Sequence, residues 1–171
     1  MSKTRVITLV IISMLFLIAL YLVEFSPYSA REVAKYNGGF GTFDMKKYDY
    51  ATVSFVLSKM EPGGKAATVH YYAADYIFVL FFGLFQGYVV YLLYHHFGVR
   101  ACFLAVTIPI MRGIFDIIEN TLLLHTVLHY PRINEMVVRI ASLCTAGKLF
   151  MIKLWVIEVL IGFILIRRGG R

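Results

Sequence analysis

Cysteine is scarce in this sequence, and its placement does not suit a cross-link. The 171 residues include two cysteines, Cys102 and Cys144, which we expect at opposite depths of a helical bundle. A disulfide needs Cα atoms within roughly 7 Å of each other, so an intrachain bridge is excluded. Neither cysteine belongs to a C-x-x-C pair, so the sequence does not indicate a disulfide oxidoreductase.

The signatures of common soluble enzymes are also missing. The sequence has no P-loop, no G-x-S-x-G elbow, no H-E-x-x-H motif and no dinucleotide fingerprint. Charged residues make up only 16% of the chain, with a net charge of +7. The basic residues flank apolar runs instead of forming a patch, so we predict no nucleic-acid partner.

Long apolar runs dominate what is present. Hydrophobic residues make up 60% of the chain, and the mean hydropathy is +0.74. Each run has the roughly 18–20 residues that a helix needs to cross about 30 Å of hydrocarbon. We therefore predict an all-α membrane protein, a four-transmembrane-helix bundle forming one domain over 1–171. The predicted spans are 6–23, 72–94, 101–127 and 140–166.

The distribution of basic residues predicts the topology. Residues 24–71 carry six basic and five acidic residues and are nearly neutral. The basic residues that flank the spans on the other predicted side have no acids among them, which is the positive-inside pattern: Lys3, Arg5, Arg100, Arg167, Arg168 and Arg171. We predict a multi-pass protein of the plasma membrane with both termini cytoplasmic and an extracytoplasmic segment over 24–71. The first run is longer than a signal-peptide core, and we interpret it as a retained anchor.

The extracytoplasmic segment is too long to be an idle loop. Val53, Val56, Leu57 and Met60 follow helical spacing. We predict a short amphipathic helix over about 48–60 that lies on the membrane surface or caps the bundle.

The third span carries a polar stripe. Arg112, Asp116, Glu119 and Asn120 share one helix face at 100° per residue. Ionisable groups at this depth face protein or water, because exposure to lipid costs a few kcal/mol or more. Pro109 removes a helix hydrogen bond just before the stripe and predicts a kink.

The fourth span carries charges that match this stripe in depth. At about 1.5 Å per residue, opposite charges on the two antiparallel helices fall at three common levels. Helical spacing turns Lys153 about 140° from the other two charges of its span, so all three cannot face span three squarely. The matched groups are Lys148 with Glu119 and Asn120, Lys153 with Asp116, and Glu158 with Arg112.

The second span adds Asp75 near the outer interface and Gln86 near mid-depth, on nearly the same face. Beside them, Gly83-x-x-x-Gly87 would allow close approach of a neighbouring helix. Trp155 lies near the middle of span four, where it either packs in the core or forms one wall of a cavity.

These buried charges allow two interpretations. They form either a structural ion-pair network that fixes helix register or a polar cavity that binds or transfers something. We favour a site open toward the outer side that binds or acts on a lipid, isoprenoid or quinone-like molecule. A proton- or ion-coupled transport component and an accessory or assembly subunit, as a homo-oligomer or with a partner membrane subunit, remain alternatives. The candidate residues are Asp116 and Glu119 as general acid or base, Lys148 as electrostatic anchor, and Asp75, Asn120, Gln86, Trp155 and Arg112 for binding.

Histidines offer a separate test for a metal or haem. His125 and His129 are spaced i, i+4 at the outer end of span three, and His70 is expected at a similar height. Such residues either ligate haem or zinc or simply line the interface. We favour the interface and assign no metal ligand and no cofactor.

A set of segments follows residue 36: Asp75-Tyr76-Ile77-Phe78, Asp116-Ile117-Ile118-Glu119-Asn120, Tyr130-Pro131, Ser142, Thr145 and Lys148. Together these segments resemble an uncharacterised bacterial family of four-helix integral membrane proteins. The resemblance covers most of the chain after residue 36, and the D-x-x-E-N motif of the third span is its most specific element. It implies a bacterial inner-membrane protein and no known activity.

Overall fold

The computed structural model describes residues 2–169, and no strand occurs among them. Four helices in this range are long and apolar enough to cross a membrane, so the predicted all-α fold with four such helices is confirmed. The helices are α1 (Lys3–Phe25), α2 (Ala30–Ala34), α3 (Tyr50–Ser58), α4 (Gly64–Tyr94), the 3-10 helix η1 (His95–Phe97), α5 (Val99–His129) and α6 (Glu135–Gly169).

Local chemistry sets several of the helix boundaries. Asp49 caps α3, since its Oδ1 accepts hydrogen bonds from the Thr52 amide (2.8 Å) and the Thr52 hydroxyl (2.7 Å). These bonds lower the pKa of Asp49. Gly98 separates η1 from α5 with φ +94°, a backbone conformation that favours glycine. The helix α5 continues through Pro109, which lies inside it.

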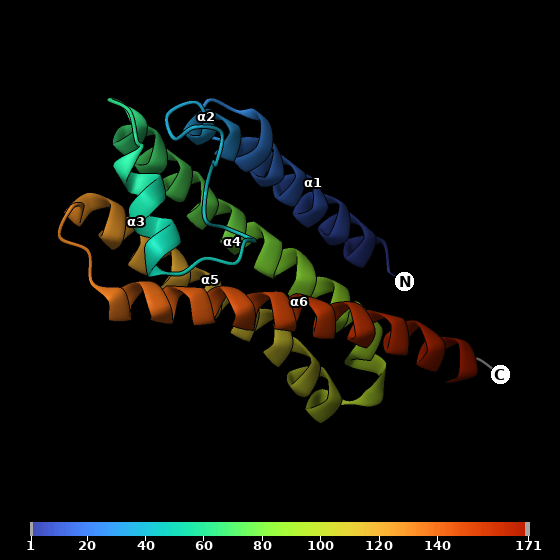
Figure 1. Ribbon diagram of the computed structural model, residues 1–171. Coiled ribbons are helices and arrows are strands. Elements are labelled where there is room, and N and C mark those ends of the chain that lie inside the picture. Colours follow the sequence, from blue (N-terminus) through green and yellow to red (C-terminus); the bar gives the residue numbers. More distant parts are fainter. Residues whose placement is uncertain (1, 170–171) are drawn as a thin grey trace.

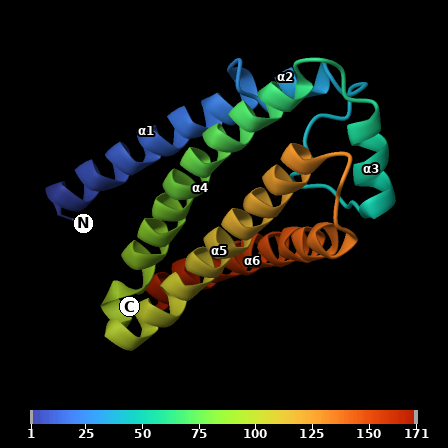
Figure 2. The same ribbon diagram turned by 90° about the vertical axis from the view of Figure 1, so that its left-hand side faces the viewer.

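The long helices form a bundle with one helix at its side. The central helix α5 packs against both α4 and α6, whereas α1 packs mainly along α4 (Figures 1 and 2). The start of α1, the end of α6 and η1 lie toward one end, which we call the η1 end (Figure 1). The segment 26–63, here the linking segment, joins α1 to α4 and covers the other end, here the capped end.

The largest hydrophobic core lies at the capped end. It joins the linking segment to the long helices: Val53 of α3 is fully buried, as are Tyr72 of α4 and Leu123 of α5. The linking segment includes α3 within the predicted range 48–60. Asn37 closes a turn ahead of it, donating to the Gly41 carbonyl (2.6 Å) and accepting from the Gly41 amide (2.9 Å). The linking segment is therefore a packed part of the fold.

The glycine pair of α4 does not mediate helix contact. A Cβ added at Gly83 or Gly87 would meet nothing within 4 Å, so the predicted close approach is wrong. Both glycines instead line an apolar cavity of about 600 Å³ between α1, α4 and α5. Close packing occurs at Gly147, where an added Cβ would lie 3.1 Å from the ring of Phe115. The motif therefore marks an open groove in this chain.

Candidate functional site

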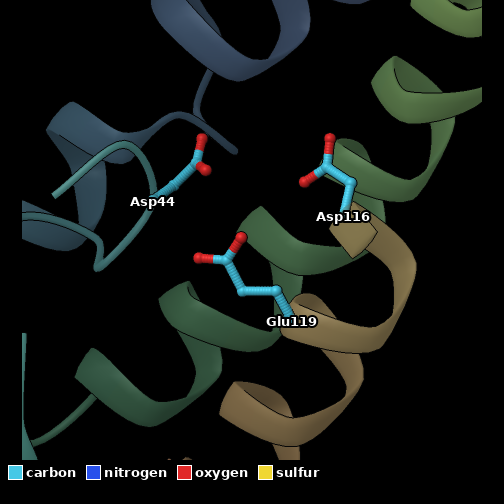
Figure 3. A group of neighbouring side chains, drawn as sticks. All are labelled: Asp44, Asp116 and Glu119. Atoms are coloured by element: carbon cyan, nitrogen blue, oxygen red, sulfur yellow. The ribbon is translucent and has the colours of Figure 1, made fainter. Parts of the chain in front are cut away.

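Lys148 on α6 is the point at which three carboxyl groups meet. Its Nζ lies 2.9 Å from Asp116 Oδ1 and 2.7 Å from Glu119 Oε2, and it also forms an ion pair with Asp44 Oδ1. Asp116 and Glu119 are one helix turn apart on α5, so both face α6. Asp44 comes from the linking segment, and the three carboxyl groups converge on a common centre (Figure 3). The predicted match between Lys148 and Glu119 is therefore a direct contact.

Arg112 extends the ion pairs one turn toward the η1 end. Its Nη2 lies 3.1 Å from Asp116 Oδ2 and donates a hydrogen bond to the Val79 carbonyl (3.4 Å). The guanidinium carbon stands 4.5 Å from the ring centroid of Phe82. Arg112 thus turns toward α4, and the predicted pairing with Glu158 is wrong. Among residues 2–169, Glu158 takes part in no ion pair.

Asp75 and Asn120 form a second pair beside the first group. Asn120 Nδ2 donates a hydrogen bond to Asp75 Oδ2 at 2.6 Å, and both side chains are buried. In the described part of the chain, Asn120 Oδ1 and the Tyr72 hydroxyl are buried without a hydrogen-bond partner. Buried polar atoms of this kind have unused capacity to bind a proton donor or water.

The second oxygen of Glu119 binds hydroxyl groups. Thr145 Oγ1 donates to Glu119 Oε1 at 2.6 Å, and the Tyr48 hydroxyl lies 3.5 Å from the same oxygen. The Tyr48 and Thr145 hydroxyls are 3.0 Å apart, and Ser142 Oγ donates to the Tyr48 carbonyl (2.8 Å). Burial, and then the charge of Glu119, raise the pKa of Tyr48 well above its usual value. Tyr48 therefore remains a neutral hydroxyl at physiological pH.

Asp44 connects the group to solvent. The Tyr71 hydroxyl donates to Asp44 Oδ2 at 3.3 Å, and the Asp44 side chain is 21% exposed. The other four members of the ion-pair group have side chains no more than 7% exposed. With Asp75 they form what we call the charge cluster: Asp44, Asp75, Arg112, Asp116, Glu119 and Lys148.

The charge cluster contains more acid than base. It has four carboxyl groups and two cationic side chains, so full ionisation would leave two excess negative charges. Uncompensated charge is costly in a buried, low-dielectric site. The cluster is therefore an environment that favours additional positive charge, and an anion would be repelled.

The carboxylates have a spacing that could suit a metal ion. One oxygen from each of Asp44, Asp116 and Glu119 lies within 4.8 Å of the others. Lys148 Nζ contacts a carboxyl oxygen of all three residues, so an intrinsic ammonium serves as their shared cation. A metal would have to displace Lys148, and the donor set therefore fits a lysine better than a metal.

The remaining candidates lie apart from the charge cluster. Gln86 is fully buried nearer the η1 end, and Trp155 Nε1 donates to its backbone carbonyl (3.3 Å). Trp155 is partly buried. Lys153 is exposed, so its predicted level match with Asp116 produces no contact. Lys153 makes no contact with Asp116 because helical spacing turns it about 140° away from Lys148 around the axis of α6.

Sequence reasoning missed Asp44 and Tyr48. Asp44 is one of five acids in residues 24–71, whose net charge is close to zero. In the sequence, 104 positions separate it from Lys148. Tyr48 resembles any interfacial tyrosine in the sequence. The one available signal is the length of the linking segment, which indicates a packed element without saying which side chains enter the bundle.

The cavities near the charge cluster lie outside it. Two cavities of about 290 and 360 Å³ at the capped end are lined by Tyr48, Asp49 and Ser142, together with neighbouring residues. The 600 Å³ cavity lies on another face of α4 and α5. None of the three is lined by Glu119 or Lys148, so the predicted ligand pocket around Glu119 stays a prediction.

The outer histidines do not assemble into a ligand set. The rings of His125 and His129 lie 4.0 Å apart, and His129 Nδ1 contacts the His125 carbonyl (2.8 Å). His70 packs edge-on against Tyr28. Within the described residues, the one group of three metal-ligating side chains contains no histidine.

Comparisons with known proteins place the chain in no established group. No family model, no curated protein and no solved structure matches it. The bacterial family named above therefore stays a prediction, and the function must be argued from the site.

Proposed function

We propose that this chain is a multi-pass protein of the plasma membrane whose charge cluster takes up and releases protons at the outer face. The observation that carries the proposal is the charge imbalance: three buried carboxyl groups and the partly exposed carboxyl group of Asp44 surround two cationic side chains. Of the functions considered from the sequence, proton coupling is the one that this imbalance favours.

The orientation follows from the charges at the η1 end. Lys3 and Arg5 begin α1, Arg100 lies at the start of α5, and Arg167 and Arg168 lie near the end of α6. Positive residues at the span ends are retained in the cytoplasm. The capped end, with Asp44, then faces the outside.

Protons fit the site better than larger cations. The ammonium of Lys148 already occupies the point on which three carboxyl groups converge. A proton adds positive charge without needing new volume, whereas a metal or amine needs a cavity. The partly exposed Asp44 supplies the contact with outer water, and its ion pair with Lys148 leads inward to Asp116.

Infrared difference spectroscopy of the reconstituted protein tests this proposal directly. Cycling the membranes between acidic and alkaline buffer should reveal a reversible band of a protonated buried carboxyl group. Asp116→Asn and Glu119→Gln should each remove or shift that band. Glu135→Gln, which changes an exposed acid at the start of α6, is the matched control and should leave it unchanged. A wild-type protein without any titrating buried carboxyl band would refute the proposal.

Binding of a lipid, isoprenoid or quinone-like molecule is the second candidate. It is supported by the two cavities that Tyr48 separates from Glu119, since displacement of Tyr48 would join them to the charge cluster. Mass spectrometry of the purified protein tests it. A defined small molecule that copurifies with the wild type and is lost from Lys148→Met would favour this function over proton exchange.

A further inference from the structure

From Arg112, the member of the charge cluster nearest the η1 end, three buried polar side chains without full partners extend toward that end. Gln86 is 0% exposed, and within residues 2–169 neither its amide nitrogen nor its amide oxygen has a hydrogen-bond partner. The same holds for Arg112 Nε and for Glu158 Oε2, and Glu158 is 8% exposed. Native interiors rarely leave so many polar atoms unsatisfied, and buried water is the usual partner.

These side chains follow one another along the bundle. Arg112 is paired with Asp116 and stacks on Phe82 of α4, and Gln86 is one turn of α4 further toward the η1 end. Trp155 of α6 binds the Gln86 carbonyl, so α6 meets α4 at this level. A turn of helix rises about 5.4 Å, which is a gap that one or two water molecules span.

Glu158 continues the series toward the η1 end. It lies three residues after Trp155 on α6, and the Tyr94 hydroxyl of α4 donates to its backbone carbonyl (2.8 Å). Helical spacing places Lys148, Trp155 and Glu158 within about 80° of one another on the inward face of α6. Lys153 points away and is exposed. Within residues 2–169, Glu158 is therefore an acid on the inner face of the bundle without an ion-pair partner.

We infer that water held by Arg112, Gln86 and Glu158 continues the charge cluster into a transmembrane proton path. This inference rests on the proposed function and extends it from proton exchange at one face to proton transfer across the membrane. Each step breaks one O–H bond and forms another, so the net change is one proton moved from outer to inner water. The amide of Gln86 orients water as donor and acceptor and is not itself protonated. Glu158 is the inner relay carboxyl.

Proton flux into proteoliposomes containing a trapped pH dye, driven by a potassium diffusion potential, tests the path. We expect Gln86→Leu and Glu158→Gln to reduce flux by about ten-fold or more while keeping the infrared band of the charge cluster. Gln86→Glu, which keeps a polar side chain at this position, should retain flux. Lys153→Gln on the same helix is the matched control and should conduct like the wild type. Size-exclusion profiles identify variants that fold.

The outcomes separate the two proposals. A wild type whose flux equals that of empty liposomes, with the infrared band present, would overturn the path and leave proton exchange in place. Wild-type flux in both Gln86→Leu and Glu158→Gln would also overturn it. Absence of the infrared band would refute the proposed function, and the path would fall with it.

Discussion

The two halves of the bundle differ in how their buried charged side chains are paired. At the capped end, Lys148 has three carboxyl partners and Glu119 also accepts a hydrogen bond from a hydroxyl. Toward the η1 end, Glu158 is buried and takes part in no ion pair within the described chain. The difference arises because the linking segment contributes Asp44 and Tyr48 to one half only. The lesson is that a loop between spans can complete an intramembrane site.

The largest expected effect comes from removing the shared cation. Lys148→Met should lower the free energy of unfolding by about 3–5 kcal/mol, because the remaining carboxylates lose their common partner. Lys153→Met, on the exposed face of the same helix, should change it by less than about 0.5 kcal/mol. Unfolding by a denaturing detergent, measured in one mixed-micelle system, provides the comparison. Equal effects of the two variants would mean that Lys148 is not central to the fold.

Neutralising one acid in each half of the bundle should lower the free energy of unfolding by unequal amounts. Asp116→Asn breaks ion pairs with both Arg112 and Lys148 and should cost about 2–3 kcal/mol. Glu158→Gln loses no ion pair and should cost less than about 1 kcal/mol. The same unfolding assay measures both variants. A greater loss for Glu158→Gln would reveal an undetected partner and reverse the comparison.

Removing one tyrosine hydroxyl from each half of the bundle should produce a smaller difference in stability. Tyr48→Phe loses contacts with Thr145 and Glu119 and should cost about 1 kcal/mol. Tyr94→Phe loses its hydrogen bond to the Glu158 carbonyl in a less buried setting and should cost about 0.5 kcal/mol. Thermal unfolding followed by circular dichroism distinguishes them. Identical melting shifts would argue against a tighter network at the capped end.

The smallest effect on stability is expected at the partly exposed acid. Asp44→Asn should cost about 0.5 kcal/mol, since Asp44 is the one partly exposed partner of Lys148 and solvent weakens its ion pair. The change should instead appear as faster hydrogen exchange in residues 41–48, which lose one of their contacts with α6 and keep those of Tyr48. Asp49→Asn is the control in the same segment, because asparagine also caps helices. Unchanged exchange in Asp44→Asn would show that packing alone holds this segment.

Hydropathy predicted the helices because a membrane span must be long and apolar regardless of its partners. Comparing depths at about 1.5 Å per residue also placed Lys148 beside Glu119, because a short turn joins α5 to α6 and fixes their relative depth. It failed for Arg112 and Glu158, because depth does not say which neighbour a side chain faces. Arg112 turns to the ring of Phe82 on α4, and Glu158 is rotated about 80° from Lys148.

The partners of Asp44 could not be predicted in the same way. No periodicity relates a loop carboxyl to a lysine 104 positions away. Tyr48 has the same difficulty, because its contacts depend on how the linking segment packs. Sequence patterns therefore identified the helical half of the candidate site, and tertiary packing determined the half supplied by the loop.

The convergence of charges on Lys148 has a consequence for biogenesis. A helix that enters lipid with an unpaired charge at its centre pays about 2.5–3.5 kcal/mol for that charge. Only residues 130–134 separate α5 from α6, so these helices can leave the translocon as a hairpin with Lys148 already neutralised by Asp116 and Glu119. In the proposed orientation, Asp44 crosses the membrane earlier, with the linking segment. Because Asp44 pairs with Lys148 of α6, we expect it to complete the site only after the last helix has been inserted.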